Sequence, residues 1–265
     1  MFCIQYFKNG VHKYLEYADE LKIYYDSEDS TLPAFLDKYK DKTIIINIPI
    51  KEKMDLNFFK SLYEQHPNFK LCLTSFAINF EEIQEIGIPY FFTHVATTID
   101  EVYGLINYKV SDIYVGEDMG FILDKVAPII HKHNIKVRIY PNICQSSWET
   151  TPAIKTFFVR PDDIDLYSKY VDVFDLISDA DRQVILKIYH EKKWLGNLSE
   201  IIPSFTDDVN NMYLLNTFGK YRVSCGKKCL LNPEGGCQMC DVAVDLSKTL
   251  TTKIEKVKAE KEKNL

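Results

Sequence analysis

Clustered cysteines near the end of the chain are its clearest sign of chemistry. Four of the seven cysteines, Cys225, Cys229, Cys237 and Cys240, have the spacing C-x3-C-x7-C-x2-C. Two adjacent glycines precede the final CxxC pair, and glycine allows the tight backbone turns that bring several thiolates to one centre. Thiolates select zinc or iron–sulfur clusters over calcium or magnesium. The run therefore predicts a metal centre, with two disulfides or four unliganded thiols as the alternatives.

A fifth cysteine, Cys144, is also a candidate ligand. It follows the expected strand Lys136–Pro141 in a polar loop, whereas Cys3 and Cys72 lie inside apolar strand-like runs. We predict that those two are buried small hydrophobic residues. Five candidate thiolates then compete for what are usually four ligand positions, and spacing alone does not identify the cysteine that does not bind the metal. The odd total of seven cysteines fits a framework of disulfides poorly.

Composition and charge set the class of protein. With 46% hydrophobic and 26% charged residues, the 265-residue chain is typical of a soluble globular protein with one barrel-sized domain or two smaller ones. It has no apolar run of about twenty residues, so no membrane span is predicted. The N-terminus has no basic leader, so we expect a cytoplasmic protein. The net charge of −6 argues against a broad basic patch for nucleic acid.

Short apolar runs alternate with helix-length segments through the first two-thirds of the chain. Nearly continuous apolar strands separated by helices predict a parallel sheet covered on both faces, and the number of units favours an α/β fold of the (β/α)8 TIM-like barrel type. The helices are short, so a distorted or incomplete barrel is an alternative. No glycine-rich dinucleotide or P-loop motif follows a strand. The expected strands are Phe2–Phe7, Leu21–Tyr25, Thr43–Ile48, Lys70–Ser75, Tyr90–Ala96, Asp112–Gly116, Lys136–Pro141, Thr156–Val159 and Val173–Ile177. The expected helices are Leu32–Tyr39, Leu56–Gln65, Phe80–Ile86, Asp100–Tyr108, Phe121–His133 and Asp181–Lys193.

This pattern divides the chain into three parts. Residues 1–178 are predicted to form the barrel. Residues 179–241 are predicted to form a small helical, cysteine-rich cap that packs on the barrel. Residues 242–265 mix both signs of charge and read as a solvated helix or tail.

Polar residues that follow the expected strands are candidate catalytic residues, because barrel enzymes place their chemistry at the carboxyl ends of the strands. Asn47, His94 and Glu117 occupy such positions. Arg160 is the best candidate for binding an anion, since its planar guanidinium suits a carboxylate or phosphate. Each has a structural alternative. Asn47 would satisfy backbone groups, and His94 would be a core histidine. Glu117 would be a solvated loop charge, and Arg160 would pair with a nearby aspartate.

The segment Phe157-Phe158-Val-Arg160-Pro161-Asp162-Asp163 and its continuation through Val173-Phe174 resemble the collagenase-like peptidase U32 family. In that family an arginine-proline-acid segment precedes a tyrosine-bearing helix. Three further segments are similar to it, in the same order along the chain: Asn142-Ile-Cys144, Gly196-Asn197-Leu198 and Cys237-Gln-Met-Cys240. The resemblance spans roughly residues 90–241, and its weight comes from the order and spacing of these segments.

The resemblance implies a barrel that carries a 4Fe–4S cluster. Cys144, Cys229, Cys237 and Cys240 would hold the cluster, with Cys225 as a competitor for one position. Relatives of this kind act in oxygen-independent hydroxylation, in ubiquinone synthesis or on bases of transfer and ribosomal RNA. The implied role is an enzyme, or an accessory subunit with a redox or hetero-oligomeric partner, acting on a small aromatic molecule or an RNA base.

Two other functions remain open on the residues alone. One is a peptidase or other hydrolase that uses zinc, as the family name suggests, although no serine, cysteine–histidine or HExxH arrangement is readable. The other is a non-catalytic barrel whose four C-terminal cysteines form a structural zinc knuckle.

Overall fold

The computed structural model describes residues 1–8, 13–49, 54–74, 80–116, 119, 122–142, 159, 161–178 and 184–193. They form a mixed α/β structure whose paired strands all run parallel. The strands are β1 (Phe2–Gln5), β2 (Glu20–Tyr24), β3 (Thr43–Ile48), β4 (Phe69–Leu73), β5 (Tyr90–Phe92), β6 (Val95–Ala96), β7 (Asp112–Val115), β8 (Lys136–Ile139) and β9 (Val173–Leu176). The α-helices are α1 (Leu32–Lys38), α2 (Leu56–Gln65), α3 (Phe80–Ile86), α4 (Ile99–Asn107), α6 (Leu123–His131), α7 (Ile164–Tyr167) and α8 (Val184–Glu191). Short 3-10 helices are η1 (Leu15–Tyr17) and η3 (Pro161–Asp163).

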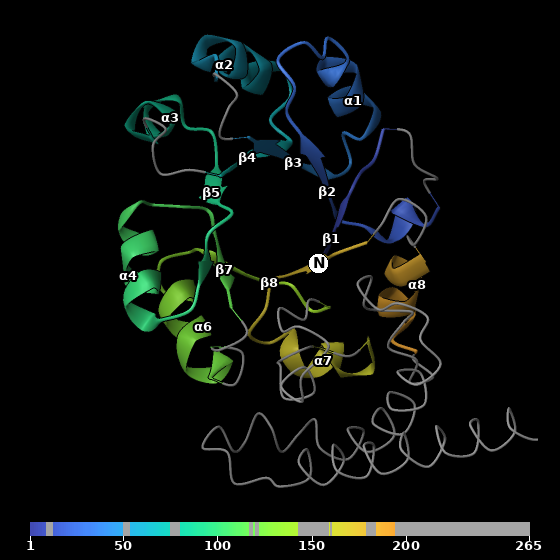
Figure 1. Ribbon diagram of the computed structural model, residues 1–265, viewed down its shortest axis with the longest axis vertical. Helices are drawn as coiled ribbons and strands as arrows, with labels where there is room; N and C mark the ends of the chain where they lie inside the picture. Colours follow the sequence, from blue (N-terminus) through green and yellow to red (C-terminus); the bar gives the residue numbers. More distant parts are fainter. Residues whose placement is uncertain are drawn as a thin grey trace, which may run out of the picture.

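The nine strands form one nearly closed, barrel-shaped sheet in the order β5-β4-β3-β2-β1-β9-β8-β7-β6. The first strand, β1, lies between β2 and the last strand, β9. Figure 1 shows the strands around a ring, with the helices outside it. This nearly closed sheet of nine parallel strands is consistent with the predicted TIM-like barrel.

The two edge strands of the sheet, β5 and β6, follow one another directly in the chain, so the ring closes there through the backbone. We predicted a single strand over Tyr90–Ala96, but the structure divides it at Thr93 and His94. Its first part pairs with β4 and its second part with β7, so the chain changes partners across the break. The single predicted strand is therefore two short strands, each paired with a different neighbour.

Side chains cap the starts of two helices, α2 and α4. The Asp55 carboxylate accepts hydrogen bonds from the backbone N–H groups of Asn57 and Phe58 at 3.0 and 3.1 Å, at the start of α2. At α4, the Thr98 hydroxyl accepts the Glu101 N–H at 3.2 Å, which is one half of a capping box. Such caps satisfy amide groups that have no partner within the helix.

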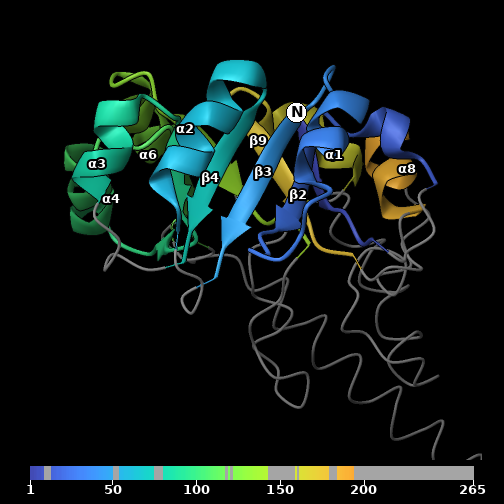
Figure 2. The same ribbon diagram turned by 90° about the horizontal axis from the view of Figure 1, so that it is seen from above.

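Outward-facing strand residues and the helices form an apolar layer. Leu21, Ile44 and Val137 are fully buried there, as are Leu36 of α1 and Phe59 of α2. Figure 2 shows α1 and α2 against the outer side of β2, β3 and β4, whose arrows point the same way. Burial of this layer is the main favourable contribution to folding.

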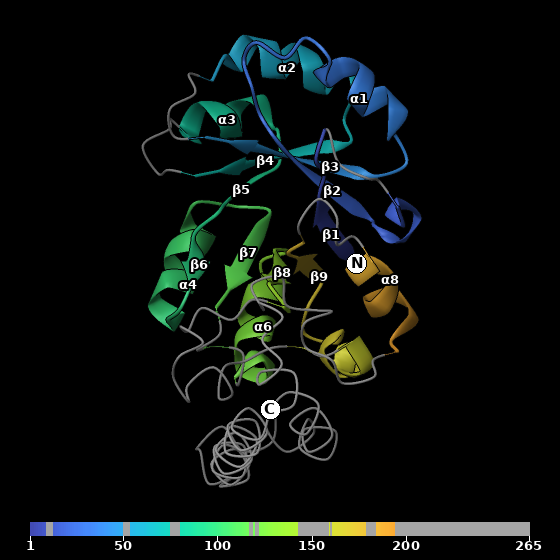
Figure 3. The same ribbon diagram turned by 45° about the vertical axis from the view of Figure 1, so that its right-hand side comes forward.

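Helix α8 covers the barrel where the chain begins. The Tyr189 ring lies 6.4 Å from the Phe2 ring, edge to face, and the Tyr189 hydroxyl donates a hydrogen bond to the Val159 carbonyl at 2.8 Å. His190 stacks on Tyr17 of η1 at 4.3 Å. Figure 3 shows α8 beside the N-terminus and β1. This helix lies within the one expected over Asp181–Lys193. The rest of the predicted cap and tail, residues 194–265, lies outside the described residues.

Inward-facing strand residues are charged, which we did not predict. Arg138 of β8 pairs through Nη2 with Glu20 of β2 and through Nη1 with Asp112 of β7 at 3.0 Å. Lys70 of β4 reaches the same Asp112 at 2.7 Å. The contacts of Arg138 with Glu20 and of Lys70 with Asp112 join strands that are not neighbours in the sheet, so they cross the inside of the ring. Most TIM barrels fill this space with branched apolar side chains.

The charges inside the ring balance. Adding the pair of Lys22 with Asp175 gives three cations and three carboxylates in four ion pairs. Charge is expensive to bury unless each group is paired, so removal of one partner leaves an uncompensated ion.

Within the described residues, none of the helices combines the length and apolar character that crossing a membrane needs.

Replacing Arg138 tests this interior. We expect Arg138→Met to lower the free energy of unfolding by about 3–5 kcal/mol, because Glu20 then lies buried without a cation. Adding Glu20→Gln should restore part of the loss, since Asp112 keeps Lys70. The control Lys192→Met breaks an ion pair with the exposed Asp165 and should cost less than about 1 kcal/mol. Urea unfolding measures all four proteins, and a loss for Arg138→Met no larger than the control's would contradict the assignment.

Candidate functional site

The carboxyl end of the barrel carries the polar groups best placed for function. Asn47, next to last in β3, aligns with Tyr24 of β2 and Cys72 of β4. Two residues earlier, Ile45 aligns with Lys22 and Lys70, which both point inward, so Asn47 also points inward. It is 6% exposed, and its Oδ1 has no hydrogen-bond partner within the described chain. A buried acceptor left open calls for a water or a ligand group.

A second amide closes the barrel next to this end. The Asn142 Nδ2 donates a hydrogen bond to the Ile177 carbonyl at 2.7 Å, and the Ile177 N–H donates to the Asn142 Oδ1 at 3.0 Å. Asn142 is almost fully buried. This two-bond clamp joins the chain leaving β8 to the chain leaving β9. It fixes the point from which the following segment departs.

Below the carboxyl end lies a layer of linked charged and phenolic groups. The Lys22 ammonium donates to the Tyr114 hydroxyl at 3.0 Å and to the Asp175 carboxylate, which also accepts the Tyr114 O–H. The Tyr140 ring stacks on the Tyr114 ring with centroids 4.6 Å apart. Lys22 also lies over both rings, at 5.6 and 5.4 Å from their centroids. The four side chains come from β2, β7, β9 and the end of β8.

The electrostatics of this layer fix its protons. Burial alone would raise the pKa of Asp175, but Lys22 and Arg138, with hydrogen bonds from Lys22 and Tyr114, lower it. Burial would lower the pKa of Lys22, and Asp175 raises it instead. Burial raises the pKa of Tyr140 to about 12. At neutral pH these shifts favour one cation, one anion and two neutral phenols in the layer. Its groups are therefore suited to a structural role rather than to proton transfer.

His94 lies apart from Asn47. It sits at the break between β5 and β6 with its side chain 39% exposed, and its Nε2 is 3.7 Å from the Glu101 Oε2. That carboxylate also accepts the Thr97 N–H at 2.6 Å, and this hydrogen bond lowers the pKa of Glu101. His94 thus faces the first turn of α4 on the outside of the barrel, while Asn47 faces the inside.

Most of the predicted site residues lie outside the described residues. These are Glu117, Arg160 and the five candidate metal ligands Cys144, Cys225, Cys229, Cys237 and Cys240. Within the part of the chain that is described, no group of three or more histidine, cysteine or acidic side chains could hold a metal ion.

The two remaining cysteines are placed as predicted. Cys3 and Cys72 are fully buried. Burial raises the pKa of Cys72 to about 12 and that of Cys3 further still. Burial thus favours the protonated form of both thiols when no metal is bound. The structure therefore places these two cysteines in the core, as predicted, and the other five stay the candidate metal ligands.

The interior charges were missed because the strands read as apolar. The available signal was alternation with a period of two: Glu20 and Lys22, and likewise Asp112 and Tyr114, alternate with buried aliphatic residues. In a strand with both faces buried, such alternation places the polar set on one face.

The Asp175 carboxylate should shape the response to acid. Its pKa is lowered in the folded protein from an ordinary value of about 3.9, so its contribution is present above that pH and is lost as the pH falls through the lowered pKa. We expect Asp175→Asn to be about 3–5 kcal/mol less stable at pH 7, because Lys22 stays buried without its anion.

The difference between the two proteins should then shrink as the pH falls from about 5 to about 2, which urea unfolding over that range measures. The control Asp165→Asn alters an exposed pair and should follow the wild-type curve. A constant gap between Asp175→Asn and the wild type at every pH would contradict the linkage.

Comparison with protein-family models, with curated proteins and with solved structures finds no match to this chain.

Proposed function

We propose that this protein is a barrel enzyme, or an accessory subunit of one, that carries a 4Fe–4S cluster. Cys144 and three of the four C-terminal cysteines would hold it, as in the collagenase-like peptidase U32 family that the sequence resembles. The reaction class would be oxygen-independent hydroxylation or modification of a small aromatic molecule or an RNA base. A bound cluster supplies electron transfer, and Lewis acidity if one iron position is open.

The Asn142 clamp is the observation that carries the proposal. It anchors the chain to the carboxyl end of β9 two residues before Cys144. In a (β/α)8 barrel this end is the catalytic face, because the loops that follow the strands gather there. A cluster held by Cys144 would then lie close to the face at which barrel enzymes bind substrate.

Two further features support the proposed cluster and a substrate site at the carboxyl end of the barrel. Cys3 and Cys72 are buried core residues inside the ring, which agrees with a centre built from the other cysteines. The open Oδ1 of Asn47 offers a buried acceptor for a substrate N–H or O–H. Below it, the Lys22–Asp175 layer holds its charges fixed, so it would orient a substrate without exchanging protons with it.

Metal analysis of protein purified without oxygen tests the cluster. We expect a brown protein with broad absorption near about 400 nm and about four irons and four sulfides per chain. Cys144→Ser should lose most of the iron, while the control Cys72→Ala, which alters a buried thiol, should keep it. A colourless protein with one zinc per chain, produced with iron supplied, would contradict the cluster. Such a result would favour a hydrolase or a structural zinc knuckle.

The role of the clamp has its own test. We expect Asn142→Ala to release iron to a chelator several-fold faster than the wild type, because two buried hydrogen bonds that anchor the segment before Cys144 are lost. The cost in stability should be about 1–3 kcal/mol.

Asn68→Ala is the matched control. The Asn68 amide donates to two backbone carbonyls, those of Tyr39 and Lys42, at 3.3 and 3.2 Å, just before the start of β4 at the opposite end of the barrel. It should lower the stability by a similar amount and leave iron release unchanged. Equal release from both variants would show that the clamp acts only through global stability.

A further inference from the structure

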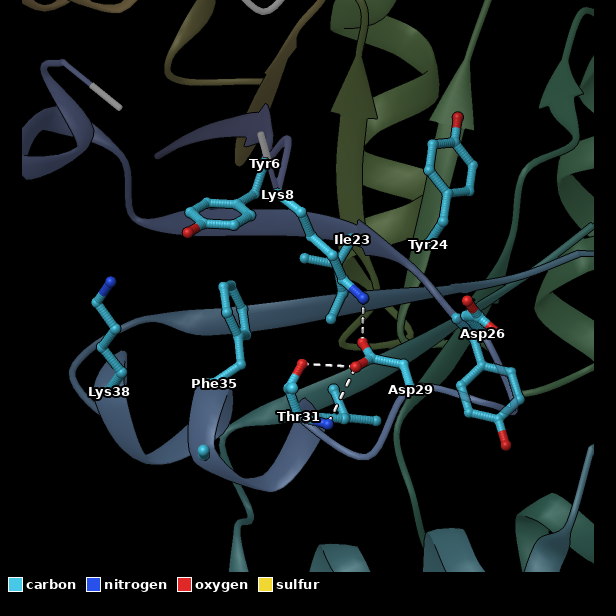
Figure 4. A pocket seen from close by; sticks show the side chains of 12 residues that line it. Tyr6, Lys8, Ile23, Tyr24, Asp26, Asp29, Thr31, Phe35 and Lys38 are labelled. Carbon is cyan, nitrogen blue, oxygen red and sulfur yellow. Dashed lines mark hydrogen bonds and ion pairs between the residues drawn. The ribbon is translucent and has the colours of Figure 1, made fainter. Parts of the chain in front are cut away.

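A groove of about 500 Å³ lies on the outer side of the barrel, between the ends of β1 and β2 and helix α1. Its volume lies in the range of small-molecule sites. Figure 4 shows the Phe35 ring of α1 pointing toward Tyr6, beside Ile23 of β2. Its described lining comes from β2, from α1 and from the segments that follow β1 and β2.

One face of α1 supplies the helical wall. Ala34 and Lys38 are four residues apart, and Phe35 lies beside them, so the three share a stripe along the helix. All three line the groove. The stripe runs from an apolar centre to a cation at the last residue of the helix.

Aromatic rings form the apolar part. The Tyr6 ring meets the Phe35 ring edge to face at 4.8 Å, and it meets the Tyr39 ring at 5.8 Å. Ile23 is half-buried beneath them. Burial and a hydrogen bond with Tyr39 raise the pKa of Tyr6 to about 12, so its phenol is neutral at physiological pH. A flat ring inserted here would meet ring edges and aliphatic carbon, the contacts that aromatic groups prefer.

The charges along the groove differ in how they are used. Lys8 pairs with Asp29, whose other oxygen accepts the Thr31 N–H at 3.0 Å. The hydrogen bond from Lys8 lowers the pKa of Asp29, so this pair is neutral as a unit. Lys38 differs: within the described chain no carboxylate lies within ion-pair distance of its ammonium, which sits over the Tyr39 ring at 4.9 Å. Figure 4 shows Lys38 at the end of the groove away from Asp29.

We propose that this groove binds a small aromatic carboxylate. The ring would lie against Ile23 and Phe35, and the carboxylate would pair with Lys38. An aromatic amine would meet no carboxylate at the Lys38 end of the groove, because the two lining carboxylates, Asp26 and Asp29, lie away from Lys38 (Figure 4). The site is independent of the proposed cluster, since no residue in it is a candidate metal ligand.

Titration of the full-length protein with 2-naphthoate, followed by calorimetry, tests the site. We expect a dissociation constant between about 10 μM and 1 mM, with 2-naphthylmethylamine and decanoate at least about tenfold weaker. Lys38→Gln should weaken 2-naphthoate about five- to tenfold, because a charge-assisted contact is lost. The control Lys40→Gln removes an exposed charge that does not line the groove, and it should bind as the wild type does.

A matched pair at Ala34 checks the position of the ligand. This exposed helical residue lines the groove, so Ala34→Lys should tighten 2-naphthoate and Ala34→Glu should weaken it, at similar thermal stability. The site would be overturned by no binding at about 5 mM, by equal binding of the amine or of decanoate, or by a Lys38→Gln variant that binds as the wild type does. None of these readings depends on iron content, so they separate this site from the cluster.

Discussion

The buried guanidinium of Arg138 is the contact on which the barrel depends. It is fully buried and pairs with carboxylates from β2 and β7, and its carbon lies 4.8 Å from the centre of the Phe91 ring of β5. A charge in this position is tolerable only when the sheet has curved far enough to bring distant strands to it. Folding the ring and pairing the charge are therefore one event.

The two faces of the sheet divide the work of the protein. Apolar side chains on the outer face pack against the helices, and this non-directional burial stabilises the fold. Charged and phenolic groups on the inner face form hydrogen bonds with defined partners and geometry, which specify how the strands are arranged. The Lys22–Tyr114–Asp175 layer, held from three strands, gives the carboxyl end of the barrel a rigid base. Groups above such a base can be held in place with little reorganisation.

Local signals in the sequence predicted the strands and helices, but they did not predict the contacts between residues that are distant in the chain. Apolar periodicity located most of the described strands, and the helix expected over Asp100–Tyr108 corresponds to α4. At the break at Thr93 and His94 the chain changes its pairing from β4 to β7, and no local pattern records such a change. The pair of Arg138 with Glu20 spans 118 positions, and single-sequence patterns carry no information about such partners. Cys3 and Cys72 were identified because strand burial is a local property. The five other cysteines are predicted from spacing and resemblance alone.

The ring consists of two arcs, β1 to β5 and β6 to β9, whose buried charges have opposite net signs. The arc from β1 to β5 holds one buried carboxylate, Glu20, and two cations, Lys22 and Lys70. The arc from β6 to β9 holds one cation, Arg138, and two carboxylates, Asp112 and Asp175. Three of the four ion pairs bridge the arcs. Each half thus carries an excess charge that only the other half neutralises, as the subunits of an obligate heterodimer do, although a single chain encodes both.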